Sequence, residues 1–504
     1  MGELLGGRAW LGQYEEAVRA RLARYDAADE RIVARLWAQD GTLWSNDAKV
    51  QAKIANRLGW LASPLTMQAR LPELDCVKNA PYRGAVLLGM GGSSLAPEVF
   101  QRVFGNASNA PRLHVLDNTS AGAVQALRDA IDPTQTLFIV SSKSGTTVET
   151  KSFADYFYEQ SGGAGAHFVA ITDPTSALAR ESDERRFAAL FLNPQDIGGR
   201  YSVLSFFGLV PAAIIGLDVE QLLARAGQEI RATTAAVPAE QNAALVLGVI
   251  MGELAAAGRD KLTFIASPTL AAFGDWAEQL LAESTGKNGV GVLPVVGERV
   301  GSPDRYRSDR LFVYLRLEGE GFHDDAVEAL REAGHPVVQL DLRDAYDLGA
   351  QFFRWEFATA VAGAVLGINP FDEPNVTESK NNTTRLLQQF QLEGSLPLPE
   401  SVVQLDGIMA SGDVAGDTPS MALRGFIAEV IEREYVAIMA YVPMSSENET
   451  ALRDLQAAIR DVTGAATTLG FGPRFLHSTG QLHKGGPAQG VFLQITHTPT
   501  VDMP

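Results

Sequence analysis

A run of small hydroxyl residues, from Ser142 to Thr147, is the first candidate for chemistry. It holds four hydroxyl groups, one glycine and Lys143. It follows an apolar run at 137–140, predicted to be a strand, and precedes a predicted helix. Such a loop offers free backbone N–H groups, hydroxyl donors and an ammonium group to an anion. Helix capping alone is the alternative, but four hydroxyls and a lysine exceed what a cap needs. We interpret the run as a phosphate-binding loop.

A glycine-rich turn, from Gly89 to Ser94, follows a second apolar run at 85–88. It could be a dinucleotide-binding fingerprint, since Asp117 ends the next predicted strand. The sixth position is Ser94, where that fingerprint has glycine, so the usual spacing is broken. We therefore expect these glycines to let a small ligand approach the backbone closely.

Two polar residues four positions apart, Gln279 and Glu283, lie in a predicted helix that Gly286 ends. This spacing places both side chains on one helical face. Glu283 would lie in the last turn, where the helix dipole disfavours negative charge. The dipole should raise the pKa of that carboxyl group toward the range of a general base. The alternative is a solvated surface glutamate, with Lys287 as a simple charge complement of the helix end.

Further candidates are an arginine, a lysine and two histidines. Arg200 follows two glycines, which suits a guanidinium reaching over a tight turn toward an anion, although a surface arginine is the alternative. Lys380 lies in the first turns of a predicted helix, where the dipole disfavours it, so we expect it to have another role. His477 and His483 share a loop and are candidates for proton transfer or for solvated loop histidines. Histidine and cysteine do not recur at metal-ligand spacing elsewhere, so we expect no metal.

These residues need a scaffold of strands alternating with helices. Such alternation predicts parallel sheets covered on both faces, with ligands at the carboxyl ends of the strands. Buried strands are predicted at 85–88, 113–116, 137–140, 167–171, 262–266, 311–315 and 337–340. The predicted division is a helical N-terminal segment (1–80), a first α/β unit with the hydroxyl loop (81–235), a second with Glu283 and Lys380 (236–391), a linker (392–419) and a small C-terminal α/β unit with the histidine loop (420–504).

Composition restricts the partners and the compartment. The 504 residues are 20% charged and 46% apolar, as in ordinary globular proteins, and predict two or three domains. The net charge of −18 argues against nucleic acid or an anionic membrane as partner. The single cysteine, Cys76, excludes an internal disulfide and fits a reducing cytoplasm. The most apolar windows, such as 358–368, are shorter than a membrane span. We expect a cytoplasmic protein that captures a small anion with local positive groups.

Taken together, these motifs resemble glucose-6-phosphate isomerase. The resemblance rests on Gly89–Ser94, Ser142–Thr150, Gly198–Ser202 and Glu283–Lys287, and runs from about residue 40 to 390. It implies two flavodoxin-like sugar-isomerase (SIS) domains and, in most family members, a homodimer. It also implies that Glu283 moves a proton between C2 and C1 and that Arg200 stabilises the enediolate. The implied substrate contacts are Gly92, Ser93, Ser142, Lys143, Ser144, Gly145, Thr146, Thr147 and Gln279.

The sequence departs from the family pattern at two places. Glu373 stands where the motif that precedes Lys380 usually has glutamine. The family's catalytic histidine segment usually lies before that lysine, whereas Leu476 to Gln481 resembles it and lies after. The chain therefore looks like the isomerase half of bifunctional transaldolase/glucose-6-phosphate isomerase proteins. His477, helped by Lys380, would open the sugar ring, with His483 as its rival, and the subunit that supplies the histidine stays open.

The expected activity is interconversion of glucose 6-phosphate and fructose 6-phosphate through a cis-enediol. Because the chemistry is proton transfer, neither a metal nor a nicotinamide cofactor is required. A non-catalytic sugar-phosphate sensor is one alternative, although a sensor has no need for Glu283, Arg200, Lys380 and a histidine together. Another alternative is an isomerase of a different 6-phosphorylated or 6-sulfonated hexose, because a hydroxyl loop recognises the anionic group more than the sugar.

Overall fold

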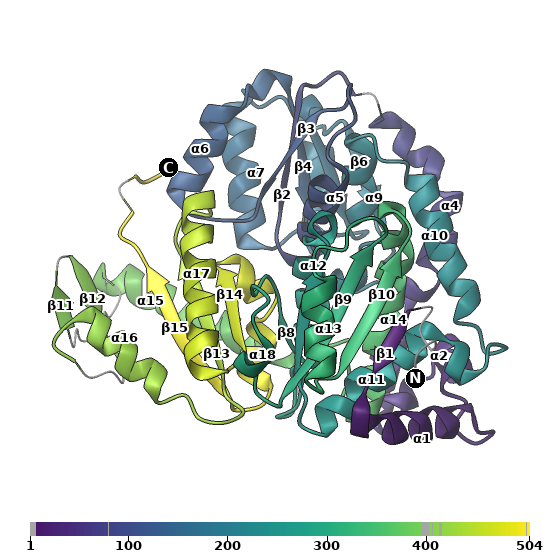
Figure 1. The fold of residues 1–504 in the computed structure, drawn as a ribbon. Coiled ribbons are helices and arrows are strands. Elements are labelled where there is room, and N and C mark those ends of the chain that lie inside the picture. Colours follow the sequence, from purple (N-terminus) through teal and green to yellow (C-terminus); the bar gives the residue numbers. More distant parts are fainter. Residues whose placement is uncertain are drawn as a thin grey trace.

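The computed structural model describes residues 7–78, 80–395, 403–405, 407–412, 416–499 and 501–503, without the side chains of 377–380. Two five-stranded sheets form the body of the molecule, and a three-stranded sheet lies beside the second of them (Figure 1). The predicted α/β class with parallel sheets is confirmed. Among the described helices, none combines the length and the apolarity that crossing a bilayer requires.

The first sheet brings the two predicted ligand loops together. All its strands are parallel, in the order β3-β2-β4-β5-β6, which is 2-1-3-4-5 in chain order and therefore flavodoxin-like. Gly89 at the end of β2 is the register partner of Ser141 at the end of β4. The glycine turn and the hydroxyl loop thus leave the sheet side by side. The strands are β2 (Gly84–Gly89), β3 (Arg112–Leu116), β4 (Thr136–Ser141), β5 (Phe168–Thr172) and β6 (Ala189–Leu192).

The second sheet has the order β1-β10-β9-β7-β8. Its strands are parallel except β1, which pairs antiparallel with β10 and comes from the N-terminal segment that was predicted to be helical. A strand of three residues carries too short a pattern to be recognised in sequence. The strands are β1 (Arg8–Trp10), β7 (Lys261–Ala266), β8 (Leu293–Val295), β9 (Arg310–Leu317) and β10 (Val337–Leu342).

Helices cover both sheets and join them into one core. The central pair is α11 and α14, both apolar almost all round and buried along most of their length. One continuous apolar cluster runs from the strands of the first sheet through these helices to the second. The helices are α1 (Glu15–Asp26), α2 (Ile32–Trp37), α3 (Ala48–Ala55), α4 (Ser63–Ala69), α5 (Leu95–Phe104), α6 (Ala121–Ala130), α7 (Val148–Gln160), α8 (Ala177–Glu184), α9 (Phe206–Ile214), α10 (Val219–Ala232), α11 (Ala243–Ala256), α12 (Phe273–Thr285), α13 (Asp324–Glu332), α14 (Leu348–Leu366) and α15 (Pro374–Glu393).

The C-terminal unit is a small parallel sheet of the order β14-β13-β15. Its apolar face packs on α12 and β8 of the second unit through Ala282, Leu293, Tyr435 and Leu482. The segment predicted to be a linker contains a short antiparallel hairpin, β11–β12. The elements are β11 (Val403–Leu405), β12 (Ile408–Ala410), α16 (Pro419–Ala428), β13 (Tyr435–Tyr441), α17 (Ser446–Thr463), β14 (Thr467–Phe471), α18 (Gly480–Gly485) and β15 (Gly490–Thr496).

Candidate active site

The hydroxyl loop joins β4 to α7 and is closed by its own side chains. The Ser142 hydroxyl accepts a hydrogen bond from the Gly145 N–H at 3.1 Å, and the hydroxyls of Ser144 and Thr146 lie 2.8 Å apart. Gly145 has φ +68°, and a Cβ there would lie 2.4 Å from the backbone nitrogen of Leu178, so only glycine fits the turn. The loop therefore presents hydroxyls and backbone amides at the carboxyl end of the sheet, as an anion site requires.

Lys143, a predicted member of this loop, has its ammonium group engaged elsewhere. That group lies 2.5 Å from the Asp173 carboxylate and donates to the Gln195 carbonyl at 3.2 Å. The hydroxyls and backbone amides are therefore the groups of this loop that are available to an anion first, and the predicted substrate contact of Lys143 stays a prediction.

The glycine turn after β2 is where three distant segments converge. A Cβ on Gly92 would lie 2.1 Å from the Gly199 carbonyl oxygen. A Cβ on Gly91 would lie 2.8 Å from the Gln279 amide nitrogen and 3.2 Å from the Cβ of His477. The glycines therefore allow the Arg200 turn, α12 and the histidine segment to meet. The predicted close approach of a small ligand to these glycines stays a prediction, because the approach seen here is that of other segments of the chain.

Helix α12 presents Gln279 and Glu283 on one face, as their spacing predicted. The Gln279 amide group donates to the Glu283 carboxylate at 3.2 Å and to the His477 carbonyl at 2.8 Å. The amide oxygen of Gln279 is buried and has no hydrogen-bond partner among the described residues. A buried acceptor in that state is suited to a ligand hydroxyl.

The Arg200 side chain lies next to Glu283 and is almost fully buried, with 4% of it exposed. Its Nη1 contacts Glu283 at 3.2 Å and Glu373 at 3.3 Å. The remaining donors bind the hydroxyl of Ser284 at 2.8 Å and the carbonyls of Pro370 and Asp372 at 2.7 and 3.0 Å.

The pKa of Glu283 is raised, in the direction predicted but for a different reason. Burial is the largest cause, Arg200 opposes it, and the negative charge of Glu373 adds to it. The prediction attributed the shift to the end of the helix dipole. Desolvation is the stronger effect because the carboxyl group is buried where α12, the Arg200 turn and the histidine segment meet. The sequence does not show that these segments meet.

His477 reaches this site within the same chain. Its Nε2 lies 3.1 Å from Oε1 of Glu149, in the first turn of α7 directly after the hydroxyl loop. The other candidate, His483, contacts the Tyr435 hydroxyl at 2.8 Å inside the C-terminal unit. Burial lowers the pKa of His483 to about 4. His477, not His483, thus lies at this site, because its carbonyl also accepts from the predicted residue Gln279 at 2.8 Å. Sequence reasoning did not single out Glu149, although its place at the end of the loop was the available signal.

The histidine segment is held by contacts to both α/β units. Arg474 forms ion pairs with Asp117, at 2.7 Å, and with Glu98 in the first unit. Ser478 donates to Glu278 of α12 at 3.0 Å. These contacts bracket His477 on both sides along the chain, so its position depends on both units.

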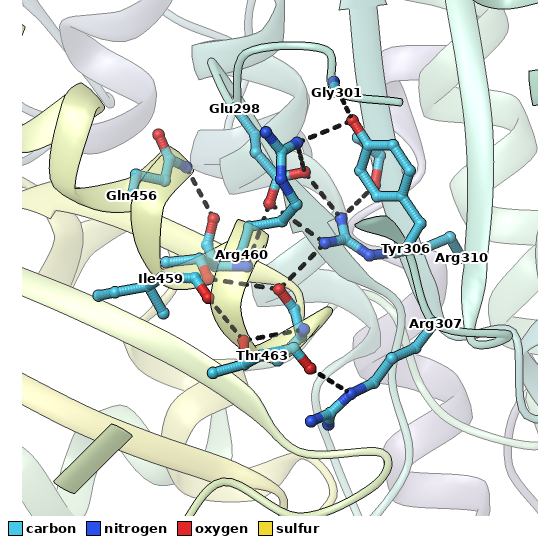
Figure 2. Close-up of polar contacts among 12 residues, drawn as sticks. Glu298, Gly301, Tyr306, Arg307, Arg310, Gln456, Ile459, Arg460 and Thr463 are labelled. Carbon is cyan, nitrogen blue, oxygen red and sulfur yellow. Dashed lines mark hydrogen bonds and ion pairs between the residues drawn. The ribbon is translucent and has the colours of Figure 1, made fainter. Parts of the chain in front are cut away.

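A buried ionic cluster fastens the C-terminal unit that carries this segment (Figure 2). Glu298 and Arg310 of the second unit are both fully buried, and their nearest charged atoms lie 3.1 Å apart. Arg460 of α17 contacts the same carboxylate at 3.6 Å and the Tyr306 hydroxyl at 2.8 Å. Arg310 also donates to the Ala465 carbonyl at 3.2 Å, and this hydrogen bond links the second unit to the residues just before β14.

Lys380 belongs to α15, but its side chain lies outside the described residues. Its predicted catalytic role therefore stays a prediction. A second lysine, Lys287, is buried beside the site, where its ammonium group binds the Asp372 carboxylate at 2.8 Å and the Asn369 carbonyl at 2.7 Å. Burial lowers the pKa of Lys287 to about 8. It fastens the turn that leads into α15.

Comparisons with known proteins identify relatives of this chain. The family model "Phosphoglucose isomerase" matches residues 79–292. Glucose-6-phosphate isomerase of Rubrobacter xylanophilus is 30% identical over 422 residues, covering 70% of this chain and 92% of that protein. The enzyme of the same name from Parabacteroides distasonis is 27% identical over 392 residues, covering 66% and 87%.

Solved structures show the same fold. A hypothetical protein from Thermus thermophilus superposes with a TM-score of 0.64 and 25% identity, covering 75% of this chain and 99% of that one. A glucose-6-phosphate isomerase from Chlamydia trachomatis gives a TM-score of 0.60 at 18% identity, covering 75% and 87%. The narrower resemblance, to the isomerase half of bifunctional proteins, stays a prediction. The chain belongs to the glucose-6-phosphate isomerase family.

Proposed function

We propose that this chain interconverts glucose 6-phosphate and fructose 6-phosphate through a cis-enediol(ate). The proposal is carried by a series of contacts that runs from Glu149, directly after the hydroxyl loop, to Glu283. Glu149 contacts His477 at 3.1 Å, the His477 carbonyl accepts from Gln279 at 2.8 Å, and Gln279 donates to Glu283 at 3.2 Å. A phosphate in the loop would leave the C1–C2 edge of the sugar within reach of the Glu283 carboxylate.

Glu283 is the proposed base. Its carboxylate takes the proton from C2 of the open-chain aldose and returns it to C1, while a proton also passes from the C2 hydroxyl to the C1 oxygen. The buried Arg200 guanidinium offsets the negative charge that develops on oxygen. A positioned base contributes roughly 10²- to 10⁴-fold in rate.

Ring opening is assigned to His477 with Lys380. The imidazole would move the proton between the ring oxygen and the anomeric hydroxyl, and Glu149 would hold the imidazole through Nε2. The sugar phosphate would be bound by Gly92, Ser93, Ser142, Lys143, Ser144, Gly145, Thr146, Thr147 and Gln279.

We also propose that the protein is a cytoplasmic homodimer. The free cysteine, Cys76, supports a reducing compartment. Exposed apolar side chains on α15, including Leu387 at 58% and Leu392 at 87%, support contact with a second chain.

The test compares the wild-type protein with Glu283→Gln in a coupled assay that converts fructose 6-phosphate to glucose 6-phosphate and oxidises the product. Glutamine keeps the shape and the phosphate site but cannot accept the proton, so turnover should fall by at least about 10²-fold while sugar-phosphate binding persists. Glu393→Gln, the same change at the exposed far end of α15, is the control and should leave turnover unchanged.

Substrate choice and the sensor alternative are decided in the same experiment. A protein that binds fructose 6-phosphate without converting it would be a sensor, and this result would refute the proposal. Faster turnover of 6-deoxy-6-sulfoglucose than of glucose 6-phosphate would move the substrate to sulfonated hexoses.

A further inference from the structure

Each donor of the Arg200 guanidinium already faces a partner within the chain. Arginine has five N–H groups. The atoms that lie opposite them are the hydroxyl of Ser284, the carbonyls of Pro370 and Asp372, and one carboxylate oxygen each of Glu283 and Glu373. A substrate oxygen can therefore reach this cation only by replacing one of these contacts.

Glu373 is the contact that is easiest to replace. The two carbonyls belong to the backbone turn that Lys287 fastens, and the Ser284 side chain is fully buried. Glu283 has 17% of its side chain exposed, whereas Glu373 has 45% and makes the longest contact, at 3.3 Å. The Glu373 carboxylate lies just before the first turn of α15, so it can turn toward water while it stays near the positive end of the helix dipole.

The charges at this end of the site do not cancel. Arg200 contributes one positive charge, Glu283 and Glu373 contribute two negative charges, and Lys287 is paired with Asp372. Over these five described side chains, a count that leaves out Lys380, the sum is one negative charge before any ligand binds. A neutral hydroxyl or carbonyl at C1 is little affected by this excess, but a permanent anion at C1 is repelled.

We propose that Glu373 is a specificity-determining residue. Its carboxylate occupies the Arg200 N–H group that an oxygen of the substrate must bind, and its negative charge rejects sugar phosphates with an anionic group at C1. The inference rests on the proposed function for the placement of C1 near Arg200. It also explains why glutamate stands at this position, since glutamine would hold the same donor without adding a charge.

The test measures binding by calorimetry, so it does not depend on turnover. The probes are 6-phosphogluconate, whose C1 is a carboxylate, and sorbitol 6-phosphate, whose C1 is a neutral hydroxyl. Glu373→Gln should tighten 6-phosphogluconate roughly tenfold and change sorbitol 6-phosphate by less than about twofold. Glu393→Gln removes the same charge about 30 Å away along α15 and should change neither affinity.

A second readout is the pH dependence of kcat/KM. Among the side chains that the structure describes, the charged groups that face Glu283 are Arg200, Glu373 and Lys287, and the negative charge of Glu373 raises the Glu283 pKa. Glu373→Gln should therefore move the acid limb of the profile to lower pH. An equal change for both probes, or none, would overturn the inference. A selective change in a protein that lacks isomerase activity would uphold the charge filter and refute the proposed function instead.

Discussion

Removing the charge of Glu298 should loosen the C-terminal unit and with it the histidine segment. The Glu298 carboxylate is fully buried and accepts from both Nη groups of Arg310, at 3.1 and 3.2 Å, and lies 3.6 Å from Arg460 (Figure 2). In Glu298→Gln the shape is kept, but one side of the amide is an NH₂ group. Whichever way the amide turns, that donor faces donors of a guanidinium.

The magnitude follows from the burial of both partners. Breaking a buried pair by removing one partner costs about 3–5 kcal/mol, since the other charge is left without compensation. Every 1.4 kcal/mol is a factor of ten in an equilibrium, so the population in which the unit is undocked should rise by roughly 10²-fold to a few thousandfold.

Hydrogen exchange measures this population directly. Backbone amides of β14 and α17 should exchange faster by that factor, while amides of β2 and β4 in the first sheet keep their rates. Turnover should fall as well, because His477 follows β14 in the chain. Glu328→Gln breaks an exposed pair with Arg331 and serves as the control, with less than about a twofold change in exchange.

A Glu298→Gln protein whose β14 amides exchange at the wild-type rate would contradict this prediction. Uniform acceleration in all three units would contradict it as well, because the cluster would then stabilise the whole body rather than the docking of one unit.

Three further predictions concern titration and positioning. Because burial raises the pKa of Glu283, the acid limb of kcat/KM should lie above the ordinary glutamate range near 4.5, and a pH-rate profile will locate it. Glu149→Gln should lower kcat roughly tenfold with little change in KM, because the imidazole of His477 loses its charged partner while the hydroxyl loop remains. Steady-state kinetics will check this, and Glu149→Asp should restore part of kcat. The pKa of His483 is lowered to about 4 by burial, so the unfolded chain binds a proton on this ring more tightly than the folded chain does. The free energy of unfolding should therefore fall as the pH drops from about 6.5 to about 4. In NMR the His483 ring should not titrate above about pH 5, and a midpoint near 6.5 would contradict its burial.

Much of the scaffold could be predicted from sequence because its strands are continuous apolar runs. The runs at 85–88 and 137–140 became β2 and β4, each slightly longer than the apolar run itself. Strands β1, β6 and β8 were missed because each has only three or four residues, and β8 contains Pro294, which weakens a strand pattern. Their place is decided by pairing with a longer neighbour.

The site was only partly visible in sequence. Gln279 and Glu283 share a face because helical spacing is local, and that prediction could be made from two residues. The contact between Glu149 and His477 joins positions 328 residues apart, and it exists because the C-terminal unit docks on α12. The burial that raises the Glu283 pKa likewise comes from segments that meet only after folding.

His477, the proposed ring-opening histidine, contacts Glu149 of its own chain, directly after the hydroxyl loop. Diluting the protein until any dimer separates should therefore leave the proposed base Glu283 and the proposed histidine His477 together in each molecule. Specific activity would stay constant across protein concentration, and mixing a Glu283→Gln chain with a His477→Asn chain would restore no activity.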